Sequence, residues 1–130
     1  MSRIRSKNTT GEKIVFAHLR NNQIYFQKHY KRAPGNPDIA LPRKKLAVFI
    51  DGEFWHGKTF ARLLETRGEN DYWTVKIKRN MERDKKVNEM LTTSGWKILR
   101  IWESDLKRKR TKVKYLIKIE NFLEQDIIKL

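Results

Sequence analysis

The alternation of hydrophobic and polar positions first becomes regular after Thr9. Thr9 and Glu12 have the spacing of a helix capping box, and apolar residues recur behind them, so a helix is predicted to begin here. Residues 23–30 alternate loosely between apolar and polar side chains, which is typical of a strand. Prolines and a glycine between residues 31 and 38 then predict a loop.

Two short apolar runs follow this loop and predict a pair of strands. The runs cover residues 38–41 and 45–51 and flank a polar turn, which favours a hairpin. Residues 58–71 are polar and lack such a pattern, so this stretch is expected to be mobile.

The longest periodic segment begins at residue 72 and predicts a helix to about residue 92. Its apolar residues share one face: Trp73, Ile77, Val87 and Leu91. Gly95 suits the end of this helix, and the apolar run 96–102 predicts a strand in the middle of a sheet. A last helix is predicted over 112–130, with an apolar stripe of Leu116, Ile119, Phe122, Leu123 and Ile127.

These elements run in the order α-β-β-β-α-β-α, which predicts an α/β fold with helices flanking a mixed sheet. The 130 residues suffice for one hydrophobic core, so a single domain over residues 1–130 is expected. No apolar run reaches the length of a membrane span, and the N-terminus lacks the apolar segment of a signal peptide. A cytoplasmic protein without a membrane partner is therefore expected.

The charge balance points to a polyanionic partner. Thirty Lys and Arg against fifteen Asp and Glu give a formal net charge of +15, spread along the chain. Such a field attracts phosphate backbones, although a charged surface can also serve only to keep a protein solvated. The absence of cysteine excludes disulfides and thiolate metal sites and fits a reducing compartment.

Acidic residues gather at the predicted hairpin. A turn near residues 42–45 would place Asp38 opposite Ile50 or Asp51, so that two carboxylates meet at one edge of the sheet. Glu53 would point to the same side as Asp51 if the strand continued. Carboxylates this close repel each other unless a cation joins them, and Mg²⁺ suits oxygen ligands. Asp38 taken alone is as easily explained as a turn or cap residue.

Three further residues have both a structural and a chemical interpretation. Asp84 falls on the apolar face of the 72–92 helix, either in a salt bridge to the sheet or as a group that orients His56. His56 is either an ordinary surface or core histidine or, beside carboxylates, a general acid or base. Glu12 completes the capping box, belongs to the active site, or does both.

Aromatic and basic residues supply candidate DNA contacts. Phe54 and Trp55 are adjacent, so at most one of them enters the core, and exposed aromatics in a basic protein can wedge between base pairs. The alternative for Trp55 is packing beneath the polar segment. Phosphate contacts are expected from basic residues, namely Arg3, Arg5, Lys7, Lys107, Arg108, Lys109 and Arg110.

Five blocks of the sequence follow one another in a recognisable order. They are RSKNT (5–9), Glu12, PGNPDIALP (34–42), VFIDGEFWHG (48–57) and NMERDKKVNEMLTTSGWKILRIWE (80–103). In this order they resemble the very short patch repair (Vsr-type) endonucleases, from Arg3 to about Leu106. The resemblance implies the PD-(D/E)xK, restriction-endonuclease-like fold and Mg²⁺-dependent hydrolysis of a phosphodiester in double-stranded DNA.

The resemblance also implies a role for each candidate residue. Asp38 looks like the central metal-binding aspartate of the family, and the carbonyl of Ile50 occupies the place of a backbone metal ligand. Glu12, His56 and Asp84 match the other active-site positions, which hold an acid, a catalytic histidine and a supporting acid. The pair at 54–55 matches aromatics that intercalate beside the target mismatch, and residues 1–9 resemble an arm that grips DNA.

Two neighbouring positions depart from the family pattern. The family usually has histidine and cysteine where this chain has Asp51 and Glu53, and Ser104 stands at another expected cysteine. The structural zinc of the family is bound largely by cysteines, so no structural zinc is expected here. Asp51 is instead interpreted as a direct metal ligand, with Glu53 as a further candidate.

The leading hypothesis is thus a Mg²⁺-dependent DNA endonuclease, with nicking at a thymine–guanine mismatch as the hallmark of the family. One alternative is a Vsr-related restriction or homing-type endonuclease that cuts matched duplex DNA. Another is an inactive DNA-binding protein with a nuclease fold. The presence of Asp38, His56 and Asp84 argues against inactivity. A protein that only binds DNA has no need of a carboxylate cluster, because such a cluster repels phosphate. An RNA partner fits the charge but not the resemblance.

Overall fold

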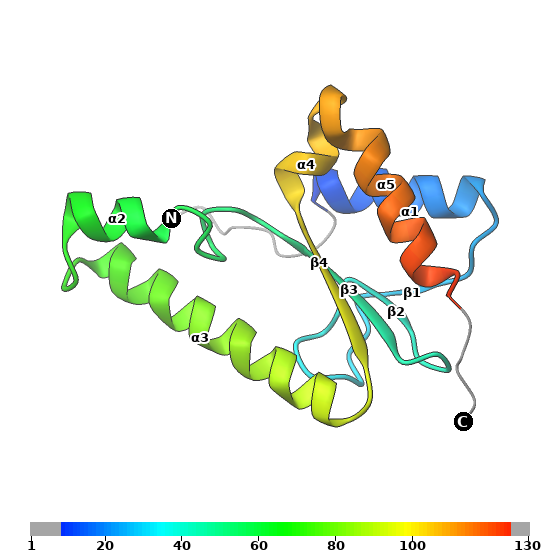
Figure 1. Cartoon of the computed structure of the whole chain (residues 1–130), viewed down its shortest axis with the longest axis horizontal. Coiled ribbons are helices and arrows are strands. Elements are labelled where there is room, and N and C mark those ends of the chain that lie inside the picture. Colours follow the sequence, from blue (N-terminus) through cyan, green and yellow to red (C-terminus); the bar gives the residue numbers. More distant parts are fainter. Residues whose placement is uncertain (1–8, 126–130) are drawn as a thin grey trace.

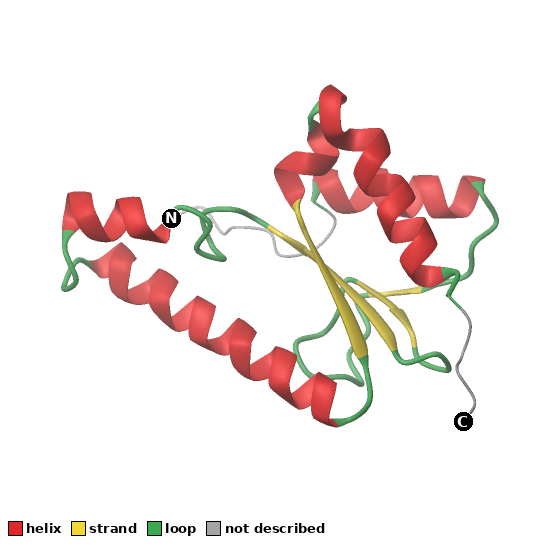
Figure 2. Cartoon of the chain, viewed as in Figure 1, coloured by secondary structure: helices red, strands yellow, loops and turns green. Residues whose placement is uncertain are grey.

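The computed structural model describes residues 9–125, in which helices cover both faces of a small sheet (Figure 1). The elements, coloured by type in Figure 2, are α1 (Thr10–Asn21), β1 (Gln27–Lys28), β2 (Ile39–Leu41), β3 (Leu46–Asp51), α2 (Phe60–Arg67), α3 (Tyr72–Thr93), β4 (Lys97–Trp102), α4 (Glu103–Lys107) and α5 (Lys109–Leu123).

The strands of the described residues form one sheet in the order β1-β2-β3-β4. The pairs β1–β2 and β2–β3 are antiparallel, whereas β3 and β4 run parallel. Parallel neighbours need a crossover connection, which α2 and α3 supply here. The sheet is therefore mixed and flanked by helices, which confirms the predicted fold class.

Strand β3 is buried along its length and contributes to two separate cores. Leu46, Val48 and Ile50 pack with residues of α1, α4 and α5, whereas Ala47 and Phe49 pack with Leu91 of α3. Figure 1 shows the same division, with α1, α4 and α5 on one side of the sheet and α3 on the other. Successive strand residues point to opposite faces, so parity along β3 decides which helices a side chain meets.

The predicted helix boundaries at α1 and α3 are confirmed. Thr9 is the N-cap of α1, and its hydroxyl accepts the backbone N–H of Glu12. Helix α3 starts after Asp71, whose carboxylate caps it by accepting the N–H of Trp73. Gly95 follows the helix with φ of +88°, a left-handed conformation that glycine adopts without strain.

Several expectations for the weaker segments are wrong. Residues 60–67 form α2, although none of its residues is buried, so the hydrophobic pattern that announces a helix is missing. The strand expected over 23–30 is reduced to Gln27–Lys28, and His29 ends it with φ of +50°. In the hairpin Ile39 pairs with Val48, which sets Asp38 level with Phe49, one residue short of Ile50 and two short of Asp51, the predicted partners.

The C-terminal third also differs from its prediction. Strand β4 is at the edge of the sheet and only half-buried, not central. The extra helix α4 follows it directly, and α5 begins at Lys109 instead of residue 112. Ile127 of the predicted stripe lies outside the described residues. None of the helices within residues 9–125 combines the length and the apolar composition needed to cross a membrane.

Candidate active site

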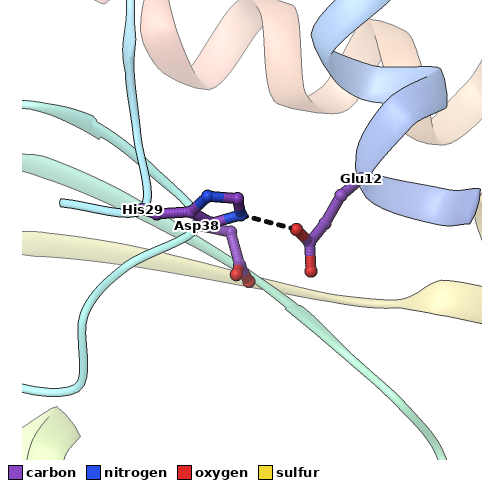
Figure 3. Close-up of side chains that lie close together, drawn as sticks. All are labelled: Glu12, His29 and Asp38. Carbon is purple, nitrogen blue, oxygen red and sulfur yellow. Dashed lines mark hydrogen bonds and ion pairs between the residues drawn. The ribbon is translucent and has the colours of Figure 1, made fainter. Parts of the chain in front are cut away.

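Glu12, His29 and Asp38 converge beside the sheet, as Figure 3 shows. Glu12 comes from the first turn of α1, His29 follows β1, and Asp38 directly precedes β2. One oxygen or nitrogen ligand atom from each side chain lies within 4.8 Å of the other two. The Glu12 side chain is 2% exposed, and its Oε1 is 2.7 Å from Nε2 of His29. Of the described residues, these are the ones gathered closely enough to hold a metal ion together.

The environment of Asp38 in this cluster disfavours its ionised form. Its Oδ2 accepts the backbone N–H of Ile50 at 2.7 Å. The pKa of Asp38 is raised to about 7, mainly by burial and also by the charges of Glu12 and Asp51, while the Ile50 hydrogen bond and the charge of His56 oppose the rise. A carboxyl group with such a pKa gains from a bound cation, because the cation replaces the proton.

A second group of polar side chains surrounds His56, close enough for the charge of His56 to lower the pKa of Asp38. The Nδ1 atom of His56 is 2.5 Å from Oδ2 of Asp84 and 3.7 Å from Oδ1 of Asp51. Burial lowers the pKa of His56, but the hydrogen bond to Asp84 and the charges of both carboxylates outweigh it, so the pKa is raised. The helix-face argument correctly placed Asp84 beside His56.

Arg100 of β4 holds this second cluster together. Its Nη1 donates to both carboxylate oxygens of Asp51, at 3.0 and 3.1 Å, and lies 3.9 Å from Asp84. Its Nε donates to Asn88, and its guanidinium lies over the ring of Phe49 at 4.1 Å. Burial raises the pKa of Asp51, and the charge of Arg100 opposes that shift.

The strand register places Asp51 on the same face of the sheet as Asp38, because Asp38 lies level with Phe49. The charges of Asp51 and His56 accordingly both act on the pKa of Asp38. Position 51 continues the odd-numbered set of β3 that faces α3, and Arg100 shares that face from β4. Glu12 reaches Asp38 from the first turn of α1. A cavity of about 320 Å³ opens on the α3 side and is lined in part by Asp51, His56, Asp84 and Arg100.

Glu53 faces away from these clusters because β3 ends at Asp51 and a turn follows. Its carboxylate accepts hydrogen bonds from the backbone N–H and the hydroxyl of Ser104. Glu53 therefore fastens the turn to the start of α4, and the continued strand that would have aligned it with Asp51 does not form.

An aromatic cluster lies beyond the end of β3. The rings of Phe54 and Trp55 contact Trp73 at centroid distances of 5.6 and 5.7 Å, and Tyr72 packs on Trp73 at 5.0 Å. Phe54 is 41% exposed and Tyr72 66% exposed, so the cluster is open to solvent. Asn80 donates to the carbonyl of Trp55 and steadies the turn.

The candidate phosphate contacts fall into two groups. Lys107, Arg108, Lys109 and Arg110 are exposed where α4 joins α5. Arg3, Arg5 and Lys7 lie outside the described residues.

Sequence reasoning missed His29, Arg100 and the position of Trp73. Arg100 carried a signal, since it is a charge inside an otherwise apolar strand segment. Trp73 was assigned to the core face of its helix, yet it belongs to the open aromatic cluster. No local pattern links His29 to Glu12 and Asp38, because the three residues meet only in the folded chain.

A mixed sheet flanked by helices, with carboxylates gathered beside its hairpin, is the arrangement of a PD-(D/E)xK nuclease. A family model described as DNA mismatch endonuclease Vsr matches residues 1–62. The type II nicking enzyme V.HpaIIP of Haemophilus parainfluenzae is 40% identical over 103 residues, covering 78% of this chain and 73% of that protein. The chain belongs to the Vsr family of DNA endonucleases.

Two other relatives extend the comparison. The type II nicking enzyme V.XorIIP of Xanthomonas oryzae pv. oryzae is 37% identical over 106 residues, covering 82% of this chain and 78% of that protein. The DNA mismatch endonuclease Vsr of Escherichia coli K12 is 28% identical over 107 residues, covering 82% of this chain and 69% of that enzyme.

Proposed function

We propose that this endonuclease nicks one strand of duplex DNA at a mismatch, using Mg²⁺ bound at Asp38 and Glu12. The main support for the proposal is that these two carboxylates converge in a strongly basic protein of an endonuclease family. The names of the relatives support the finer points, since several are nicking enzymes and one is a mismatch endonuclease. A thymine–guanine pair is the proposed target.

The donor set fits Mg²⁺. Carboxylate oxygens are its preferred protein ligands, and a buried Asp38 beside Glu12 needs a compensating cation. The backbone N–H of Ile50 points at Asp38. In an extended strand the N–H and C=O of one residue face the same edge, so the Ile50 carbonyl is positioned as a third ligand. Magnesium at this site would stabilise the charge that develops on the scissile phosphate.

His56 is the proposed proton-transfer group. Its Nδ1 is held by Asp84, which leaves Nε2 to take a proton from water or give one to the leaving oxygen. We assign Asp51 to this histidine, not to the metal, because its carboxylate is already paired with Arg100. Asp51 and Asp84 together stabilise the charged imidazolium.

The aromatic cluster and the basic residues are the proposed DNA contacts. Phe54 and Trp55, backed by Trp73, form a wedge that can unstack bases next to the cut site. The exposed residues 107–110 are proposed to neutralise phosphates, which positions the duplex without reading its sequence.

Cleavage of defined duplexes tests this proposal. Matched and thymine–guanine duplexes, labelled on each strand in turn, are incubated with the protein in Mg²⁺ and in EDTA. The proposal predicts a single cut in one strand of the mismatched duplex, only with Mg²⁺. Equal cutting of matched duplex would favour a restriction-type activity, and cutting of both strands would overturn the assignment as a nicking enzyme.

A further inference from the structure

We propose that His29 is a positioning residue that fixes the carboxylate of Glu12 in the metal site. This inference rests on the proposed function, since it concerns the site at Asp38 and Glu12. Figure 3 shows the His29 ring directed at Glu12, with the Asp38 carboxylate beside them. His29 contributes neither to the wedge nor to the cluster around His56.

The side-chain contact defines the role. Nε2 of His29 is 2.7 Å from Oε1 of Glu12, and the two side chains are 13% and 2% exposed. An ionised carboxylate only accepts hydrogen bonds, so at this distance Nε2 carries the proton and donates it. A protonated Nε2 has no lone pair for a metal. Through Nε2, His29 therefore orients the Glu12 carboxylate in the metal site.

The backbone and the ring of His29 also make contacts that fix its position. Its N–H donates to the carbonyl of Asp38 at 2.9 Å, and its ring packs edge-on against Phe16 at 5.6 Å. Its φ of +50° is left-handed, a conformation that costs a non-glycine residue free energy and persists where surrounding contacts enforce it. One residue thus joins the segments that carry both acids.

Two amide substitutions distinguish a role of the His29 side chain from a role of its backbone conformation. In His29→Gln the amide nitrogen sits where Nε2 was and can still donate to Glu12. In His29→Asn the amide is one carbon too short, yet asparagine tolerates left-handed φ better than glutamine does. A backbone role favours Asn, whereas a positioning role favours Gln. His18→Gln is the matched control, because His18 of α1 also pairs with a glutamate, Glu120 of α5, at 3.0 Å.

The readout is Mn²⁺ affinity of the folded protein without DNA, measured by calorimetry. We expect His29→Asn to weaken binding about 10–100-fold, as loss of a residue that orients a metal ligand does. His29→Gln and His18→Gln are expected to stay close to wild type. Equal affinity of the Asn and Gln variants would overturn the proposal.

Pulsed electron paramagnetic resonance of bound Mn²⁺ asks whether His29 is itself a ligand. The proposal predicts the same nitrogen modulation in wild type and His29→Gln. An imidazole signal present in wild type and lost in His29→Gln would make His29 a ligand and overturn the positioning role. Failure of the wild-type protein to bind Mn²⁺ at all would instead remove the metal site itself, and with it the role of His29.

Discussion

Arg100 and Asp51 lie diagonally across adjacent parallel strands, and Nη1 of the arginine donates to both oxygens of the aspartate. Asp51 therefore has its counter-charge inside the protein. Asp38 does not share this arrangement, since its carboxylate meets a backbone N–H and the charge of Glu12. We therefore propose different roles for the two aspartates at the hairpin, with Asp38 as the one that binds the cation.

The Asp51–Arg100 pair is predicted to be a coupled structural unit. Arg100→Leu leaves a buried carboxylate without its partner and is expected to cost about 3 kcal/mol of unfolding free energy. Asp51→Asn combined with Arg100→Leu should cost less than the sum of the single changes, as urea denaturation in EDTA would show. Additive losses would contradict the coupling. A loss of Mg²⁺ affinity in Asp51→Asn as large as in Asp38→Asn would restore Asp51 as a ligand.

His56 is predicted to act in the chemical step. His56→Gln should lower the single-turnover cleavage rate about 10²–10⁴-fold, the usual contribution of a general acid or base. Asp84→Asn should cause a smaller loss, because the imidazole keeps a neutral partner at Nδ1. Fluorescence anisotropy with labelled duplex serves as the control and should show unchanged DNA binding. A His56→Gln enzyme that cuts at the wild-type rate would exclude this role.

The raised pKa of Asp38 predicts how stability depends on pH without metal. Folding raises this pKa from the ordinary 3.8 to about 7, so the folded state binds more protons than the unfolded state between these values. The unfolding free energy contributed by Asp38 therefore falls as pH rises through this window. Asp38→Asn lacks this loss and should be more stable than wild type at pH 8 by on the order of 2 kcal/mol, but not at pH 4. Thermal unfolding in EDTA at both pH values measures the difference in stability between Asp38→Asn and wild type. A stability difference that does not change with pH would contradict the raised pKa of Asp38.

The aromatic and basic residues are predicted to contribute to DNA binding in different ways. Trp55→Ala should weaken binding at every salt concentration, with an unchanged slope of log affinity against log salt. Lys107→Ala should reduce the magnitude of that slope by about 0.9, the effect of one lost phosphate contact. Binding isotherms at four salt concentrations separate the two effects. An altered slope in Trp55→Ala, or an unaltered one in Lys107→Ala, would contradict the division.

Strong periodic segments could be predicted from the sequence, and the weakly patterned ones could not. The face of α3 that carries Leu91 and Asp84 followed from spacing alone, and so did the hairpin. Helix α2 buries no residue, so its sequence gave no sign of a core-facing stripe. The error of one or two residues in the hairpin pairing arose because apolar residues occupy both faces of β3, and alternation then does not fix the register.

The site was predictable as a set of candidates but not as two clusters. Sequence proximity placed Asp51 and Glu53 with Asp38. Asp51 is instead hydrogen-bonded to Arg100, and the turn after Asp51 directs Glu53 to Ser104. The partners that decide their roles, Arg100 and Ser104, come from a strand and a helix about fifty positions away. Such pairings depend on the parallel contact of β3 with β4, which no local pattern specifies.

The central claim is that Asp38 holds a metal required for strand cleavage. Its most direct test is single-turnover cleavage of a labelled thymine–guanine duplex by wild type, Asp38→Asn and the matched control Asp71→Asn, which keeps its helix cap. The account predicts Mg²⁺-dependent cutting by wild type and Asp71→Asn, and DNA binding without detectable cutting by Asp38→Asn. Wild-type cleavage rates in Asp38→Asn, or cutting in EDTA, would contradict it.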